Sequence, residues 1–289
     1  MMQSFTLKFD KFCLELGPET CIMGILNATP DSFSDGGKFN TFDKAVKQGI
    51  KLAEDGAHIL DIGGESSRPF AAPVSEQEEI DRVIPVIEKL SKKINIPISI
   101  DTVKSKVAKE ALNAGACIIN DVSAFEKDPA MADLAAQRDL PVVLMHMKGT
   151  PETMQLNPDY DDLMSEITNH LQSRSAYAME KGIQKHNIIL DPGIGFGKTV
   201  EHNLVIIKHL EKIMALGFPL LIGPSRKSFI QNILTKKNKF QIGPDNIETE
   251  YGTLAAVAAS IQNGAHIVRV HDVARANSFV HIIDSIRNA

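Results

Sequence analysis

Three polar residues, each at the end of a short apolar run, carry groups suited to binding a flat nitrogen heterocycle. Asp101, Asn120 and Asp191 offer two carboxylate acceptors and an amide that both donates and accepts. One carboxylate can accept two parallel N–H bonds from a ring edge that carries an amino group beside a ring amide. If the three side chains meet in one water-poor cavity, we expect them to hold such a ring by its edge.

Cationic side chains follow other apolar runs and are suited to phosphate oxygens. They are Arg68, Arg226, Lys227, Arg269 and His271. Asn27, with Asp31 and Asp35 nearby, supplies oxygen ligands of the kind that Mg²⁺ accepts beside substrate phosphates. The residue types alone therefore indicate a heterocycle, a diphosphate and Mg²⁺.

A repeating pattern of apolar run, polar loop and helical stretch must position these residues. Most runs are continuously apolar, as expected for parallel strands covered on both faces. The expected strands are Cys21–Asn27, His58–Gly63, Pro97–Asp101, Cys117–Asp121, Pro141–His146, Asn187–Asp191, Pro219–Gly223 and Ala265–Val270. Eight strand–helix units close a (β/α)₈ TIM barrel, whereas a doubly wound open sheet has fewer strands and a glycine-rich turn after its first one.

Local signals mark the helices and the ends of the chain. Ser75, three residues before Glu78, forms a capping box that opens a helix toward Leu90. Glycines just past a helix predict left-handed caps. They follow the helical ranges Phe42–Glu54, a helix ending at Asn113, Asp159–Lys181 and Gly252–Asn263. We expect one domain over residues 1–289, with Ser4–Glu19 as a hairpin or plug on the barrel's N-terminal face and Lys236–Asn246 as an exposed loop.

The shared position of these polar residues, at the ends of the strands, indicates a binding site more strongly than any single residue does. In a TIM barrel the loops after the carboxyl ends of the strands build the active site. A carboxylate or amide at one strand end is equally well explained as a helix cap. Polar residues at all eight strand ends are poorly explained by capping alone, so we expect a binding site there.

Composition restricts the class of protein and its partners. The 289 residues fit one barrel of about 250 residues or two domains. With a net charge of −5 the chain lacks the basic surplus of a nucleic-acid binder. Cys13, Cys21 and Cys117 are too few and too irregularly spaced for a disulfide framework or a zinc site. No apolar run approaches the ~20 residues that span a bilayer, and the N-terminus lacks a signal-peptide pattern, so we expect a soluble cytoplasmic protein.

Two familiar motifs fail on inspection. The segment Gly193–Thr199 resembles a phosphate-binding P-loop, but Pro192 stands where the first glycine is required. The dinucleotide pattern G-x-G-x-x-G fails because its last position is Lys198. We interpret these glycines as a flexible loop, and we expect His146, which has no neighbour at metal-ligand spacing, to be structural or to line the pocket.

Several stretches resemble the dihydropteroate synthase family. Met23–Gly37 (MGILNATPDSFSDGG) is similar to its first signature, and Gly63–Pro69 (GGESSRP) to its second. Four later stretches also resemble the family in the right order: Leu144–Gln155, Asp191–Lys198, Ser225–Phe229 and Arg269–Asp272. The resemblance covers essentially the whole chain.

The resemblance implies a folate-pathway transferase on a (β/α)₈ barrel. It would join p-aminobenzoate to (dihydropterin)methyl diphosphate and release diphosphate with Mg²⁺, which Asn27 would bind. The resemblance assigns the pterin to Asp101, Asn120, Asp191, Lys227, Met145, Phe196 and Gly223. It assigns the diphosphate to Asn27, Ser67, Arg68, Arg269 and His271. It assigns the aminobenzoate, with which sulfonamides compete, to Phe33, Pro69, Phe196 and Ser228.

The catalytic set implied by the resemblance is Asn27, Asp31, Asp35, Asp101 and Lys227. Family members are typically dimers through helices late in the chain, so a homodimer is expected. Ser67 departs from the family's usual Thr and retains the hydroxyl, so diphosphate binding should survive while loop packing or the sulfonamide response differs. Ala28, where Val is common, is a milder departure.

Three alternatives remain open at this point. Methyltetrahydrofolate-dependent methyltransferases share the barrel and the Asp/Asn pterin site, but have no reason to carry Ser67–Pro69 together with Ser225–Ser228. A non-catalytic pterin-binding protein would show saturable binding without turnover. A sulfonamide-insensitive relative is disfavoured mildly by the ordinary second loop.

Overall fold

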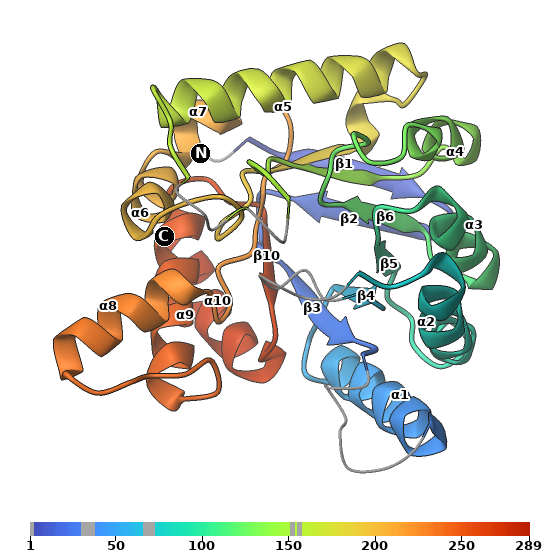
Figure 1. Ribbon diagram of the computed structural model, residues 1–289, viewed down its shortest axis with the longest axis horizontal. Coiled ribbons are helices and arrows are strands. Elements are labelled where there is room, and N and C mark those ends of the chain that lie inside the picture. Colours follow the sequence, from blue (N-terminus) through green and yellow to red (C-terminus); the bar gives the residue numbers. More distant parts are fainter. Residues whose placement is uncertain (1–2, 30–37, 66–72, 151–153, 155–157) are drawn as a thin grey trace.

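The expected apolar runs form eight parallel strands in the computed structural model, which describes residues 3–29, 38–65, 73–150, 154 and 158–289. Within that part the strand order is β8-β7-β6-β5-β4-β3-β10-β9. A parallel bridge between Leu190 and Leu220 joins the two ends of this order. The sheet is therefore closed into the expected TIM barrel, with the helices arranged around it (Figure 1).

The strand bounds agree with the predicted runs to within two residues. They are β3 Cys21–Asn27, β4 Ile59–Gly63, β5 Ile98–Asp101, β6 Ile118–Asp121, β7 Val142–Met145, β8 Ile188–Asp191, β9 Leu221–Ile222 and β10 Ile267–Val270. All five residues of β4 are buried, as are all four of β6, β7 and β8. Burial on both faces explains why these strands read as continuous apolar runs.

Helices follow the strands along the chain. They are α1 Lys38–Glu54, α2 Glu76–Leu90, α3 Ser105–Ala114, α4 Ala130–Arg138, α5 Leu163–Glu180, α6 Val200–Lys208, α7 Leu210–Met214, α8 Ser228–Asn238, α9 Ile247–Gln262 and α10 Val273–Asn288. Ser75 caps α2 by accepting a hydrogen bond from the Glu78 backbone N–H, as predicted, but the Glu78 carboxylate pairs with Arg82, so only half of the predicted capping box is present. A short 3₁₀ helix, η2, covers Lys185–Asn187.

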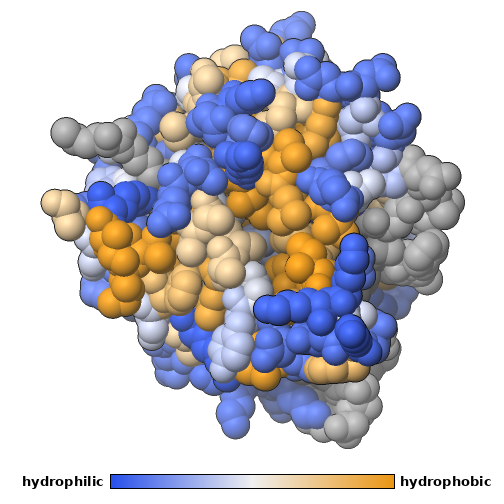
Figure 2. Space-filling view, turned by 90° about the vertical axis from the view of Figure 1, so that its left-hand side faces the viewer, coloured by the Kyte–Doolittle hydropathy of each residue, from blue (hydrophilic) through white to orange (hydrophobic). Residues whose placement is uncertain are grey.

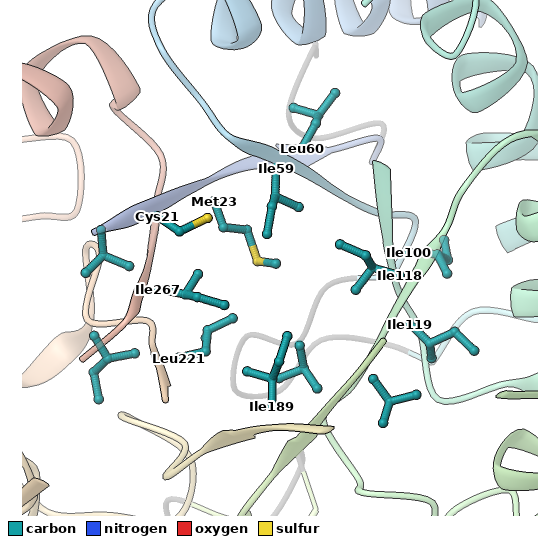
Figure 3. Packing of buried hydrophobic residues seen from close by; sticks show 14 of the residues in the cluster. Cys21, Met23, Ile59, Leu60, Ile100, Ile118, Ile119, Ile189, Leu221 and Ile267 are labelled. Atoms are coloured by element: carbon teal, nitrogen blue, oxygen red, sulfur yellow. The ribbon is translucent and has the colours of Figure 1, made fainter. Parts of the chain in front are cut away.

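The barrel interior is filled by side chains from different strands. Figure 3 shows Met23, Ile59 and Ile267 pointing toward one another from β3, β4 and β10. All three are fully buried. Packing of this kind makes the barrel a solid core and leaves its two ends as the places for loops and ligands.

The N-terminal residues form an antiparallel hairpin of β1 Phe5–Phe9 and β2 Phe12–Leu16. Leu7 and Leu16 are buried in the same apolar cluster as the barrel strands. The Gln3 carbonyl lies 3.0 Å from Nε2 of His266, just before β10 begins. The hairpin therefore covers the amino ends of the strands, so the opposite end of the barrel remains for the binding site.

Two predicted boundaries are wrong near the end of the chain. Helix α9 begins at Ile247 rather than Gly252, because Asn246 caps it by accepting a hydrogen bond from the Glu248 backbone N–H. Gly252 lies inside the helix, where an added Cβ would be 2.4 Å from Cγ2 of Ile230 in α8. This glycine serves close helix packing, not a helix start.

The predicted exposed loop over 236–246 is also partly wrong, because α8 continues to Asn238. Separately, no helix in the described ranges is long and apolar enough to cross a membrane.

Candidate functional site

The carboxyl ends of the strands bring the predicted heterocycle-binding residues together. Asp101 and Asn120 are directly paired across β5 and β6, and Asp191 ends β8 opposite Met145 of β7. Asn120 is 4% exposed and Asp191 is 7% exposed. The two carboxylates and the amide thus line one end of the barrel from within, as the residue types predict.

A buried carboxylate that the sequence reasoning did not single out links two of the predicted residues. Asp61 in β4 is fully buried, and its Oδ2 accepts hydrogen bonds from Asn120 Nδ2 at 3.0 Å and from Arg269 Nε at 2.7 Å. Arg269 also donates through Nη2 to Asp101 Oδ2 at 2.7 Å. An aspartate inside a continuous apolar run signals a buried partner, because an unpaired charge is costly to bury.

Burial raises the pKa values of both carboxyl groups proposed to meet a ligand. The pKa of Asp101 rises to about 7, mainly through loss of water, with the charges of Asp61 and Glu79 acting in the same direction and Arg269 and Lys227 opposing them. The pKa of Asp191 rises to about 6 for the same main reason. The Gly193 backbone N–H, 2.7 Å from Asp191 Oδ1, limits that rise.

Arg269 keeps its charge in this setting. Burial disfavours its cation, but the carboxylates of Asp61 and Asp101 outweigh burial and raise the pKa of Arg269. The site therefore combines a guanidinium with two carboxyl groups whose pKa values are raised by burial, a combination typical of functional sites.

An apolar wall stands beside these polar groups. Met145, Met154 and Phe196 form a small buried cluster. Nζ of Lys227 lies 4.0 Å from the centre of the Phe196 ring, a cation–π contact. A Cβ on Gly195, whose φ is +82°, would be 2.8 Å from Cδ of Lys227. The glycine therefore lets this segment approach Lys227 closely.

The remaining predicted residues lie at the ends of β9 and β10. Ser225 Oγ is 2.9 Å from Nδ1 of His271 and accepts the His271 backbone N–H at 3.2 Å. An added Cβ on Gly223 would lie 3.8 Å from Cβ of Arg269, so this glycine borders the aliphatic part of the Arg269 side chain. Ser228 is the first residue of α8.

The side chain of Arg226, which the sequence predicted to bind phosphate oxygens, points toward α9. It has φ +56° and donates through Nε to Glu250 at 3.4 Å and through Nη1 to Asp245 at 3.2 Å. The structure therefore joins Arg226 to the α9 side and not to the Asp61–Arg269 cluster.

Asn27 ends β3, is half-buried, and pairs with Gly63 of β4, which in turn pairs with Asp101. The other predicted residues of the first two loops lie outside the described residues, so their roles stay predictions. They are Asp31, Phe33, Asp35, Ser67, Arg68 and Pro69.

Residues flanking the second loop are tied together. The Lys104 ammonium donates at 2.7 Å to Glu65 Oε2, to the Val74 carbonyl and to Glu79 Oε2. The Val74 backbone N–H donates to Glu65 Oε1 at 3.1 Å. Lys104 thus holds both flanks of the segment that carries Ser67 and Arg68, a role that the sequence did not reveal.

Comparison with known proteins agrees with this geometry. Residues 23–271 match a family model described as pterin binding enzyme. The chain is 46% identical over 270 residues to the dihydropteroate synthase of Synechocystis sp., covering 93% of this chain and 91% of that protein. It is 47% identical to the dihydropteroate synthase of Bacillus subtilis, covering 93% and 90%.

Solved structures of the same kind superpose closely. A Yersinia pestis dihydropteroate synthase in a sulfonamide drug complex has a TM-score of 0.90 at 41% identity, covering 99% of this chain and 100% of that one. A Xanthomonas albilineans dihydropteroate synthase in complex with 7,8-dihydropteroate has a TM-score of 0.83 at 39% identity, covering 95% and 97%.

Proposed function

The chain belongs to the pterin-binding enzyme family and, within it, to the dihydropteroate synthases, which are transferases of folate biosynthesis, and we propose which of its strand-end residues bind each substrate. The observation that carries the proposal is the cluster of Asp61, Asp101, Asn120 and Arg269, with Asp191 beside it, at the carboxyl end of the barrel. In the proposed reaction, p-aminobenzoate displaces diphosphate from (dihydropterin)methyl diphosphate.

The pterin is proposed to lie on Asp101, Asn120 and Asp191. Asn120 donates from its NH₂ group to Asp61. The amide oxygen of Asn120 would then accept a hydrogen bond from a pterin N–H. Asp191 accepts two N–H bonds from the amino-pyrimidinone edge. Met145 and Phe196 supply the apolar wall, Lys227 the cation and Gly223 the space for the ring. The Xanthomonas albilineans structure in complex with 7,8-dihydropteroate supports a pterin as the ligand of this chain.

The diphosphate is proposed to lie against Arg269 and His271. The bonds of Arg269 to Asp61 and Asp101 engage two of its five N–H donors, and others would donate to phosphate oxygens. Ser67 and Arg68 would complete this subsite from the second loop.

The donor set fits Mg²⁺ that is held largely by the substrate. Asn27 offers one amide oxygen, and the described residues contain no group of three His, Cys, Asp or Glu placed to hold an ion. Mg²⁺ commonly binds through one or two carboxylates together with substrate phosphates, so Asn27 would hold the ion with the diphosphate, and Asp31 and Asp35 are the carboxylates proposed to join it. When bound, the ion would neutralise charge on the departing diphosphate.

The aminobenzoate is proposed to direct its carboxylate to the N-terminus of α8 at Ser228, because backbone N–H groups at a helix start favour an anion. Phe196 would contact the ring, with Phe33 and Pro69 from the first two loops. A Xanthomonas albilineans dihydropteroate synthase was solved with 4-aminobenzoic acid and the Yersinia pestis one with a sulfonamide drug, which supports aminobenzoate and sulfonamides as ligands of this chain.

The protein's chemical task in this proposal is placement of charge. The dihydropterin ring can stabilise a cation at its exocyclic methylene, so the C–O bond to diphosphate breaks before the weakly nucleophilic aniline nitrogen forms the C–N bond. Arg269 and His271 stabilise the leaving group, while Asp101 stands near the developing cation in a water-poor site. The aniline nitrogen, positively charged after the C–N bond forms, then loses its extra proton to water, a step that needs no strong base.

A homodimer through the late helices is also part of the proposal. Exposed apolar side chains gather on these helices, and Figure 2 shows a broad hydrophobic area on that side of the molecule. They include Leu204, Val205, Ile233, Ile247, Tyr251, Ile282 and Ile286. An apolar area of this kind on a surface is characteristic of a protein interface.

Two variants separate the proposed subsites. Calorimetry would compare binding of the free dihydropterin with binding of its diphosphate ester. Asn120→Ala should weaken both ligands by a similar factor, because both share the ring. His271→Gln should weaken only the ester. A His271→Gln variant that binds the ester as tightly as the unmodified chain contradicts the diphosphate assignment.

A further inference from the structure

A buried lysine lies next to the proposed pterin site and has no role in the proposed reaction. Lys198 is 3% exposed and follows the glycine-rich segment 193–197, the one that only superficially resembles a P-loop. Its Nζ lies 3.0 Å from His146 Nδ1, 3.3 Å from the His146 carbonyl and 2.8 Å from the Phe196 carbonyl. Three acceptors match the three N–H groups of an ammonium ion, so the geometry fits the charged form.

His146 is the matching acceptor. Burial, together with the charge of Lys198, lowers the pKa of His146 to about 2, so its ring is neutral and Nδ1 can accept. The sequence predicts a structural or pocket-lining histidine at this position. The contacts show that His146 supports Lys198 from the end of β7.

These bonds join two neighbouring strand ends. An added Cβ on Gly193, whose φ is +71°, would lie 2.0 Å from the His146 carbonyl, and one on Gly197, whose φ is +65°, would lie 2.3 Å from the Lys148 carbonyl. The two backbones therefore touch. Tyr160 Oη donates to the Gly197 carbonyl at 2.7 Å, which fixes the end of the segment. The glycine-rich segment is a tightly packed loop and not the flexible one expected from its composition.

The same segment carries two residues of the proposed pterin site. Asp191 stands at its start and accepts the Gly193 N–H, while Phe196 packs with Met145. The charges of Lys198 and Asp191 favour each other: Lys198 opposes the burial that raises the pKa of Asp191, and Asp191 opposes the burial that lowers the pKa of Lys198 to about 7. The buried Lys198 therefore acts on the proposed pterin site through Asp191.

We propose that Lys198 is a positioning residue that ties the segment 193–197 to β7 through His146 and keeps Asp191 ionised to receive the two N–H bonds of the pterin. This inference rests on the proposed pterin-binding role of Asp191. The other titratable groups around Lys198 are His170 of α5, Lys148 after β7 and Lys227 before α8. Burial lowers the pKa of His170, so that ring is not a cation near neutral pH, and the cations that lower the pKa of Asp191 are Lys227, Lys198 and Arg269.

A double-mutant cycle on pterin binding tests the charge link. Lys198→Met and Lys198→Gln should each weaken binding of the free dihydropterin by about 10-fold or more, and in an Asp191→Asn background the same changes should cost about 3-fold or less. Lys185→Met removes an exposed lysine at the other end of β8 and should leave the affinity unchanged. Circular dichroism and thermal unfolding establish that each variant is folded. If Lys198→Met does not fold, Lys198→Gln, which keeps two N–H donors, decides the question.

The pH dependence gives a second readout that a purely structural role would not move. Loss of the Lys198 charge raises the pKa of Asp191. As the pH is lowered, pterin affinity should therefore begin to decrease at a higher pH in Lys198→Met and Lys198→Gln than in the unmodified chain. Equal losses in both Asp191 backgrounds, or an unshifted pH profile, would overturn the inference while leaving the proposed function intact. An unmodified chain that binds no pterin would contradict the proposed function itself.

Discussion

Replacing Asp61 by asparagine should isolate the charge of the buried carboxylate from its hydrogen bonds. Both described bonds, from Asn120 Nδ2 and Arg269 Nε, reach the same oxygen, Oδ2. Oδ1 is buried and has no partner among the described residues. An asparagine that places its oxygen at the Oδ2 position keeps both bonds and loses only the charge. Asp61→Ala removes the bonds as well.

The two variants should differ in stability. Asp61→Ala loses a bond to a charged guanidinium, worth about 1.5–3 kcal/mol, and a second bond worth about 1 kcal/mol, which agrees with the ~3–5 kcal/mol typical of breaking a buried ion pair. Asp61→Asn instead buries an NH₂ group near the former Oδ1, at a cost of about 1–3 kcal/mol. Arg269 keeps Asp101 at 2.7 Å in both variants. The free energy of unfolding measured in urea should therefore be lower for Asp61→Ala than for Asp61→Asn.

The pH profile of kcat/KM for the pterin diphosphate then tests the charge. Burial, Asp61 and Glu79 together raise the pKa of Asp101 to about 7. If catalysis needs ionised Asp101, activity of the unmodified chain declines as the pH falls through neutrality. Asp61→Asn removes one of the charges that raise this pKa, so its decline should occur at lower pH. An acid limb that does not move, or an Asp61→Ala variant as active and stable as the unmodified chain, would refute the reasoning.

Three further variants test other parts of the account. Asp191→Asn should weaken pterin binding by about 2–4 kcal/mol in calorimetry, because an ionic acceptor of two bonds is lost, and unchanged affinity would remove Asp191 from the pterin site. Gly195→Ala should raise KM for both substrates, since a left-handed alanine costs about 1–2 kcal/mol and its Cβ displaces Lys227. Gly243→Ala, whose Cβ meets nothing within 4 Å, is the matched control, and equal effects of the two changes would contradict this reading. Tyr251→Asp combined with Ile282→Asp should shift sedimentation toward a monomer, whereas an unchanged species would place any dimer contact elsewhere.

The strands and the face of the barrel that carries the site could be predicted because both depend on local sequence. Continuous apolar runs mark doubly covered strands, and the polar residue that ends each run marks the same barrel face. Asp101, Asn120 and Asp191 were found in this way, and the structure brings them together.

Asp61 and Lys198, which support the site, could not be predicted from the sequence, because their partners are distant in the chain. Arg269 lies 208 residues from Asp61, and His146 lies 52 residues from Lys198. No local pattern reveals such pairs, although a charged residue inside an apolar run or a glycine-rich segment does signal that a partner exists. The start of α9 was missed for a related reason, because Gly252 serves packing against α8.

The most direct test of the account is the release of diphosphate from (dihydropterin)methyl diphosphate in the presence of Mg²⁺, measured with and without p-aminobenzoate. We expect release to rise and saturate with aminobenzoate, to match the condensation product mole for mole, and to fall strongly when Mg²⁺ is removed. Saturable pterin binding without aminobenzoate-dependent release of diphosphate would contradict the account and indicate a pterin-binding protein that does not catalyse the transfer.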